Sequence, residues 1–146
     1  MLLLLVILFM PALFGCSQAP SDLKDGYYTA EAKSFDDLGW KEYVLIYVSN
    51  GKIITVEYDA FNSTGFVKSW DLNYMRKMNE AIGTYPNEFS RIYMQSLISR
   101  QSAKDVDAVS GATHSHDSFQ KLAEAAIESS KAGSKNVAIV DLSKTE

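Results

Sequence analysis

The residues with the clearest capacity for chemistry lie in one short segment, DVDAVSGATHS, at positions 105–115. Four small residues, SGAT, come directly before an apolar pattern that is typical of an amphipathic helix. Small side chains leave the backbone N–H groups at a helix N-terminus open to an anion, and the helix dipole favours negative charge there. The segment therefore suggests a phosphate site. The alternative is a tight turn in which Ser115 is the N-cap of the helix.

Two other kinds of site can be weighed against the phosphate site. His114 and His116 form an H-x-H pair beside Asp117, but residues two apart in a helix point to different faces and the chain has no third histidine. We therefore expect no metal site. A hydrolase triad of Ser110, His114 and Asp107 is formally possible. All three lie within eight residues, without the sequence of a strained nucleophile turn, so we do not favour this interpretation.

The single cysteine, Cys16, follows an uncharged apolar segment. Residues 1–15 are shorter than the ~18 apolar residues that span a bilayer as a helix and fit the apolar part of a secretory signal peptide. Leu13-Phe14-Gly15-Cys16 resembles the bacterial lipobox. This resemblance implies that Cys16 receives a diacylglycerol group and becomes the new N-terminus. The alternative is an ordinary signal peptide with an incidental cysteine. The polar residues 17–25 then form a short tether.

Three strands are expected ahead of the SGAT segment. Residues 27–33 alternate in polarity. Residues 42–49 contain a β-branched and aromatic run that is apolar on both faces, which predicts a central strand of a sheet. Asn50-Gly51 is typical of a type I′ turn. Residues 52–58 return antiparallel, and the side chains predicted to share one face are Ile54, Val56 and Tyr58.

Helices are expected in the rest of the chain. The first predicted helix ends at Gly83, the second follows Pro86 and the third ends at Gly133. Their predicted core stripes are Leu72, Met75, Met78 and Ile82; then Phe89, Ile92, Tyr93 and Leu97; then Phe119, Leu122, Ala123, Ala126 and Ile127. Residues 137–141 form a closing strand. The fold class is α+β, an antiparallel meander packed with about three helices in a single domain.

Composition limits the function further. The chain has 146 residues, enough for one domain, and 14 basic against 18 acidic residues give a net charge of −4. Without an excess of basic residues, a nucleic-acid-binding surface is not expected. One cysteine excludes an intramolecular disulfide and any site built from several cysteines.

Asp107-Ala108-Val109-Ser110-Gly111-Ala112-Thr113 resembles the signature of the FMN-binding domain family, which is Asp, two variable residues and Ser-Gly-Ala-Thr. The similarity continues in Asp25-Gly26-Tyr27-Tyr28, Gly39-Trp40-Lys41 and Asn50-Gly51-Lys52-Ile53, and together it covers most of residues 25–133. It is thin over residues 60–100. The resemblance therefore implies nothing about the residues around the isoalloxazine ring.

The family includes the flavin-carrying C and G subunits of the sodium-pumping NADH:quinone reductase and of Rnf complexes. It also includes lipoproteins that pass electrons outside the cytoplasmic membrane. In this family a flavin transferase uses FAD and magnesium to join FMN, through its phosphate, to the motif threonine. The resemblance thus implies that Thr113 is the acceptor, that Ser110, Gly111 and Ala112 form the phosphate-cradling turn, and that the transferase reads Asp107.

We therefore expect a signal peptide at 1–15, a lipidated tether at 16–25 and an FMN-binding domain at 26–146. The expected protein is an extracytoplasmic flavoprotein, anchored to the cell membrane by lipid, that relays electrons from a membrane redox donor to an external acceptor. One alternative is a lipoprotein that holds FMN or another phosphorylated ligand non-covalently, and another is an assembly lipoprotein with a vestigial motif. Trp40, Phe61 and Trp70 could stack on a flavin or simply pack within the protein.

Overall fold

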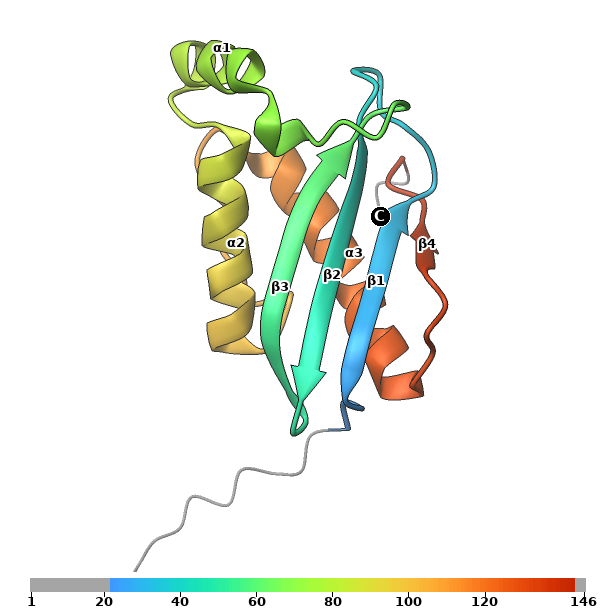
Figure 1. Cartoon of the computed structure of the whole chain (residues 1–146). Helices are drawn as coiled ribbons and strands as arrows, with labels where there is room; N and C mark the ends of the chain where they lie inside the picture. The colour runs from blue at the N-terminus through green and yellow to red at the C-terminus, as the bar shows by residue number, and fades with distance from the viewer. Residues whose placement is uncertain (1–21, 144–146) are drawn as a thin grey trace, which may run out of the picture.

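The computed structural model describes residues 22–143, and its centre is one four-stranded sheet (Figure 1). The strand order is β3-β2-β1-β4, so β2 is an inner strand, as the sequence predicts. β1 and β3 pair antiparallel with β2, and β4 pairs parallel with β1. The strands are β1 (Gly26–Ala32), β2 (Lys41–Ser49), β3 (Lys52–Phe61) and β4 (Ala138–Val140).

The helices leave one face of the sheet uncovered. α2 lies along β3 and α3 lies across β1 and β2, both on the same face, while α1 stands beyond the end of the sheet (Figure 1). The elements are the short 3-10 helix η1 (Lys68–Trp70) and the helices α1 (Leu72–Ile82), α2 (Pro86–Arg100) and α3 (Thr113–Ala132). The α+β, single-domain prediction is confirmed.

The hairpin between β2 and β3 has the predicted turn, because Asn50 and Gly51 both have positive φ, 52° and 68°. The prediction that Ile54 lies on the same face of the sheet as Val56 and Tyr58 is wrong. The register shifts beside Tyr47, so that Ile54 is an extra residue in β3. Ile53 consequently points into the core, and Ile54 is 50% exposed.

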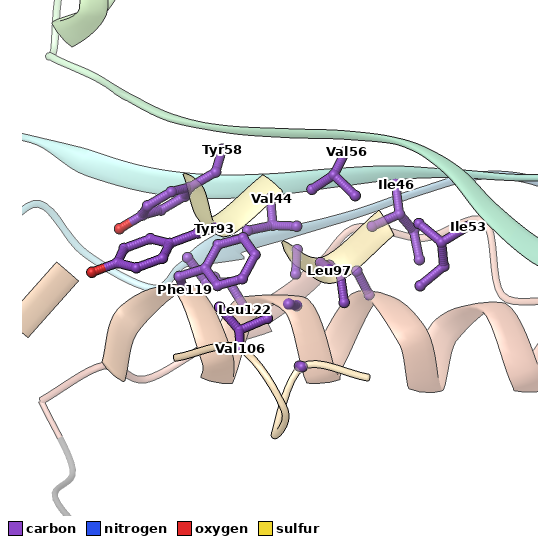
Figure 2. Packing of buried hydrophobic residues seen from close by; sticks show 14 of the residues in the cluster. Val44, Ile46, Ile53, Val56, Tyr58, Tyr93, Leu97, Val106, Phe119 and Leu122 are labelled. Atoms are coloured by element: carbon purple, nitrogen blue, oxygen red, sulfur yellow. The ribbon is translucent and has the colours of Figure 1, made fainter. Parts of the chain in front are cut away.

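The core lies between the sheet and the two packed helices (Figure 2). At its centre, the ring of Phe119 lies 5.5 Å from that of Tyr93 and 5.1 Å from that of Tyr58, joining α3 to α2 and β3. The aliphatic side chains around these rings come from both layers and include Val44, Ile46, Val56, Leu97 and Leu122. This contact between layers positions the N-terminal end of α3.

The predicted helical stripes differ in how much of them is buried. Those of α2 and α3 are largely buried, with Ile92 as the exposed exception and Ile127 partly buried. In α1 the core prediction is wrong for Leu72, which is 71% exposed, and for Ile82, which is also exposed. The reason is the position of α1 beyond the sheet, where Met75 is the buried member of its stripe.

The predicted C-terminal ends of α1 and α3 are confirmed, whereas the N-cap considered for α3 is not. Gly83 and Gly133 are both left-handed C-caps, as predicted. The N-cap of α3 is Ala112 and the helix begins at Thr113, three residues earlier than an N-cap at Ser115 would allow, so that alternative is wrong.

The signal peptide predicted for residues 1–15 and the lipidation site Cys16 lie outside the described residues. From residue 22 onward the chain contacts the domain, since Leu23 packs against the core and Lys24 N–H donates to the carbonyl oxygen of Ser130. Within residues 22–143, none of the helices combines the length and the apolar character that crossing a bilayer requires.

Candidate functional site

The SGAT turn depends on a glycine. Gly111 has a φ of 81°, in the left-handed region, and Ala112 N–H closes the turn on the carbonyl oxygen of Val109 at 2.9 Å. A Cβ placed on Gly111 would lie 3.2 Å from the carbonyl oxygen of Ile82, at the end of α1. Both its conformation and the close approach of another backbone therefore favour glycine here.

Tyr93 of α2 holds both ends of this turn from inside the core. Its hydroxyl donates to the carbonyl oxygen of Ala112 at 3.1 Å and accepts from the N–H of Val109 at 3.3 Å. Burial raises the pKa of Tyr93, partly offset by the hydrogen bond from Val109, so the phenol stays protonated and able to donate at neutral pH. Because its ring also packs on Phe119, Tyr93 fixes the turn relative to α3.

Sequence reasoning placed Tyr93 in the core and missed this contact. One signal was available: a tyrosine on a buried helical stripe brings a hydroxyl that must find a partner. The identity of that partner could not be read from local sequence, since Ala112 lies 19 residues away.

The segment before the turn is tied to both flanking helices. His116 Nε2 lies 2.7 Å from the carbonyl oxygen of Val106, and Gln120 Nε2 donates to that of Ala103 at 3.1 Å. Arg100 at the end of α2 forms an ion pair with Asp107 at 2.9 Å. Asp107 is exposed, so its side chain is accessible to another protein.

Thr113 is the first residue of α3, and its side chain is exposed. The N-cap of this helix, Ala112, has no side-chain acceptor. The first N–H of α3 with a backbone acceptor is that of His116, which donates to the carbonyl oxygen of Ala112 at 2.9 Å. In the part of the chain that the structure describes, the N–H groups of Thr113, His114 and Ser115 have no acceptor. A phosphate group would fit here, because these donors and the dipole of a 20-residue helix favour an anion.

A second buried tyrosine holds the first turn of α3 to the sheet. The hydroxyl of Tyr58 lies 3.0 Å from the carbonyl oxygen of Ser115 and 2.9 Å from Oε1 of Glu42. Burial, and then the Glu42 carboxylate, hold the pKa of Tyr58 well above its ordinary value. The start of α3 is thus supported by phenols from α2 and β3.

The structure does not assemble the other candidate sites. Within the described residues, Ser110, His114 and Asp107 share no hydrogen bond, and no three His, Cys, Asp or Glu side chains are grouped to hold a metal ion.

The three aromatic residues that could stack on a flavin do not form one group. Trp40 is buried and lies 6.1 Å from the ring of Tyr74, and Phe61 lies 6.1 Å from that of Tyr43. Trp70 is 68% exposed. For Trp40 and Phe61, packing within the protein accounts for the position.

Known proteins resemble this chain in both sequence and structure. Residues 39–128 match the FMN-binding domain family. A 15 kDa lipoprotein of Treponema pallidum (strain Nichols) is 34% identical over 119 residues, which are 82% of this chain and 84% of the relative.

Two solved structures are also similar. A crystal structure of a Clostridium perfringens protein has a TM-score of 0.78 and 39% identity, covering 82% of this chain and 98% of the other. A solution structure of a Clostridium thermocellum protein has a TM-score of 0.54 and 28% identity, covering 79% and 95%.

The architecture is a mixed sheet with a helix whose exposed N-terminus is compatible with a phosphate-bearing cofactor. The matched residues define the class more narrowly: the chain belongs to the FMN-binding domain family, and its cofactor is FMN.

Proposed function

We propose that this protein is a lipid-anchored, extracytoplasmic flavoprotein that carries FMN covalently on Thr113 and relays electrons. The donor is a redox protein of the membrane, and the acceptor lies outside it. Thr113 is the acceptor hydroxyl, Ser110, Gly111 and Ala112 form the turn beside the phosphate, and Asp107 is the residue that a flavin transferase reads. Cys16 carries the lipid.

One observation carries the proposal. The hydroxyl-bearing Thr113 is exposed at the start of α3, while the turn before it is held rigidly by the buried Tyr93. An accessible hydroxyl on a fixed backbone suits a modifying enzyme, and the unpaired N–H groups beside it suit the phosphate that the modification leaves. A phosphodiester keeps one negative charge at this position, where the helix dipole contributes about 0.3–1 kcal/mol.

The modification is a transfer from FAD that requires magnesium. The oxygen of Thr113 bonds to the FMN-side phosphorus of FAD, the pyrophosphate bond breaks, and AMP leaves with the electron pair of that bond. The proton of the Thr113 hydroxyl is released, and no oxidant or reductant is consumed. Outside the membrane a dissociated cofactor would be lost, so the covalent link retains FMN without needing high affinity.

The membrane anchor is supported by sequence and by a relative. The lipobox-like residues end at Cys16, and the Treponema pallidum relative is itself described as a lipoprotein.

The proposed electron relay depends on the cofactor. Bound flavin supplies the redox chemistry, while the chain determines where the flavin is placed. A flavin on an exposed threonine is accessible to protein partners.

The direct test is co-expression of the full chain with a flavin transferase. We expect one FMN per chain by intact mass, on the peptide that contains Thr113. Thr113→Val should remove all labelling, because valine has no hydroxyl, and should leave the fold intact, because the side chain is exposed and similar in shape.

Ser115→Ala is the matched control. It removes a hydroxyl two residues away, while Tyr58 contacts only the Ser115 carbonyl oxygen, so labelling should persist. Labelling of Thr113→Val, or none of the wild type with an active transferase, would contradict the assignment. FMN that binds the wild type and dissociates on unfolding would instead support a non-covalent flavin-binding lipoprotein.

A further inference from the structure

The two histidines of the H-x-H pair lie in different surroundings. His114 is exposed, whereas the side chain of His116 is 12% exposed and its ring packs edge to face on that of Tyr93 at 5.6 Å. Residues two apart in a helix point in different directions, so one histidine of the pair faces the interior. His116 therefore lies with Tyr93 in the support beneath the SGAT turn.

The ring of His116 donates a hydrogen bond to the loop before the turn. Nε2 lies 2.7 Å from the carbonyl oxygen of Val106, and because a carbonyl oxygen can only accept, Nε2 carries the hydrogen. Nδ1 lies 3.5 Å from Oδ1 of Asp117. Both the neutral Nε2–H tautomer and the charged ring have a hydrogen on Nε2, so the bond to Val106 persists whether or not Nδ1 is protonated.

The backbone of His116 binds the other end of the same segment. Its N–H donates to the carbonyl oxygen of Ala112 at 2.9 Å. Val106 directly precedes Asp107, and Ala112 directly precedes Thr113. Because a peptide unit is planar, fixing the two carbonyl groups also fixes the backbone nitrogen atoms of Asp107 and Thr113. One residue thus sets the separation of the two motif residues.

Asp107 needs such a support because it lies in an exposed loop. Its side chain is 84% exposed, and its carboxylate pairs with Arg100 at 2.9 Å, a contact that water screens. Gln120 Nε2 lies 3.5 Å from the carbonyl oxygen of Val106, at the limit for a hydrogen bond. The shorter bond from His116 therefore contributes most to the orientation of the peptide between Val106 and Asp107.

We propose that His116 is a positioning residue for the flavin transferase: it holds Asp107 at the separation from Thr113 that the enzyme reads. This inference rests on the proposed function. An enzyme that contacts both residues must order them on binding unless the free protein already holds them in place, and this ordering weakens association. Loss of the His116 bond should therefore weaken binding to the transferase more than the chemical step at Thr113, because Tyr93 still holds the peptide before Thr113.

The test measures labelling of the full chain by a flavin transferase with FAD and magnesium, at increasing concentrations of the chain, with intact mass as the readout. His116→Phe keeps a ring against Tyr93 and removes the donor to Val106. We expect the KM for the chain to rise about fivefold, as loss of one hydrogen bond does, while kcat stays within about twofold of the wild type. An unchanged KM would overturn the proposal, and so would a loss confined to kcat.

A double-mutant cycle shows whether His116 acts through Asp107. Asp107→Asn should also raise the KM, and adding His116→Phe to it should raise the KM no further. If the two effects multiply instead, His116 acts independently of Asp107 and the proposal is wrong.

Gln101→Met is the matched control for lost stability. Like His116→Phe, it removes side-chain hydrogen bonds to the backbone, but these bonds reach Ile53 beside the hairpin turn. Its KM should equal that of the wild type. The same rise as in His116→Phe would mean that any local loosening weakens binding, and would overturn the proposal.

The contact itself is tested without flavin. In the unloaded full chain, nitrogen NMR should show a hydrogen on Nε2 of the neutral His116 ring, and a hydrogen on Nδ1 instead would overturn the proposal. Loading of the wild type is judged separately. A wild type that an active transferase leaves unmodified contradicts the proposed function and this inference with it, whereas a modified wild type with unchanged His116→Phe kinetics overturns this inference alone.

Discussion

The hydroxyl of Tyr93 bridges the turn before Thr113, although the ring belongs to the core. The geometry of the proposed acceptor thus depends on a residue whose side chain is fully buried. Gly111 acts in the same way, because its positive φ and its approach to Ile82 permit the turn. A mutation at either position should affect flavin loading through the position of Thr113.

Tyr93→Phe keeps the ring and removes the hydroxyl. Val109 N–H then loses its partner, whereas the Ala112 carbonyl oxygen still accepts from His116. We expect the free energy of unfolding to fall by about 1–2 kcal/mol. We also expect the initial rate of FMN loading to fall at least threefold under conditions in which the variant is fully folded. Denaturant titration and intact mass over time measure the two effects.

Tyr27→Phe is the control for this prediction. The hydroxyl of Tyr27 has no hydrogen bond in the described residues, and its side chain is exposed, so both quantities should stay at their wild-type values. Wild-type loading kinetics in Tyr93→Phe would mean that the hydrogen bonds of the phenol do not position the acceptor.

Among the elements, α1 shows the difference between predicting a helix and predicting its burial. Spacing of apolar residues identified α1, α2 and α3, because it shows which side chains share a face. It cannot show whether another element covers that face, and for Leu72 and Ile82 none does in the described structure.

The same limit explains the other differences. Strict alternation placed Ile54 on the same face as Val56 and Tyr58, but the extra residue in β3 gives that place to Ile53. The motif located Ser110, Gly111, Ala112 and Thr113 in one turn, yet the partners that fix this turn, Tyr93 and Tyr58, are distant in sequence.

The weak burial of α1 leads to a prediction about its stability. Met75 is its buried residue, whereas α3 buries six. We expect the amides of α1 to exchange with solvent deuterium at least a hundredfold faster than those in the middle of α3, because opening α1 exposes little apolar surface. Hydrogen-exchange mass spectrometry measures this directly. Equal protection of the two helices would show that α1 unfolds only with the whole domain.

At the scale of the whole molecule, the two ends of the domain have different proposed functions, one in membrane anchoring and the other in carrying the cofactor. The hairpin turn and the end of α3 receive the chain from its proposed lipid, and the start of α3 carries the proposed flavin. α3 therefore sets the distance between anchor and cofactor. The proposed FMN position and the entry of the chain therefore lie at opposite ends of α3.

Cys16→Ser tests the anchored end. Without the thiol no thioether to lipid can form, so we expect either an unprocessed precursor or a protein released from the membrane. Immunoblotting of membrane and soluble fractions, with mass analysis of the N-terminus, distinguishes the two. A variant that matches the wild type in both processing and fractionation would contradict the lipoprotein proposal.

The central claim is the covalent link between FMN and Thr113. The most direct measurement is made on the native protein, isolated from its own cells, unfolded in guanidinium and filtered to remove small molecules. The proposal predicts one FMN retained per chain by absorbance and intact mass, located on the peptide that contains Thr113. An unmodified chain with all the flavin in the filtrate would contradict it.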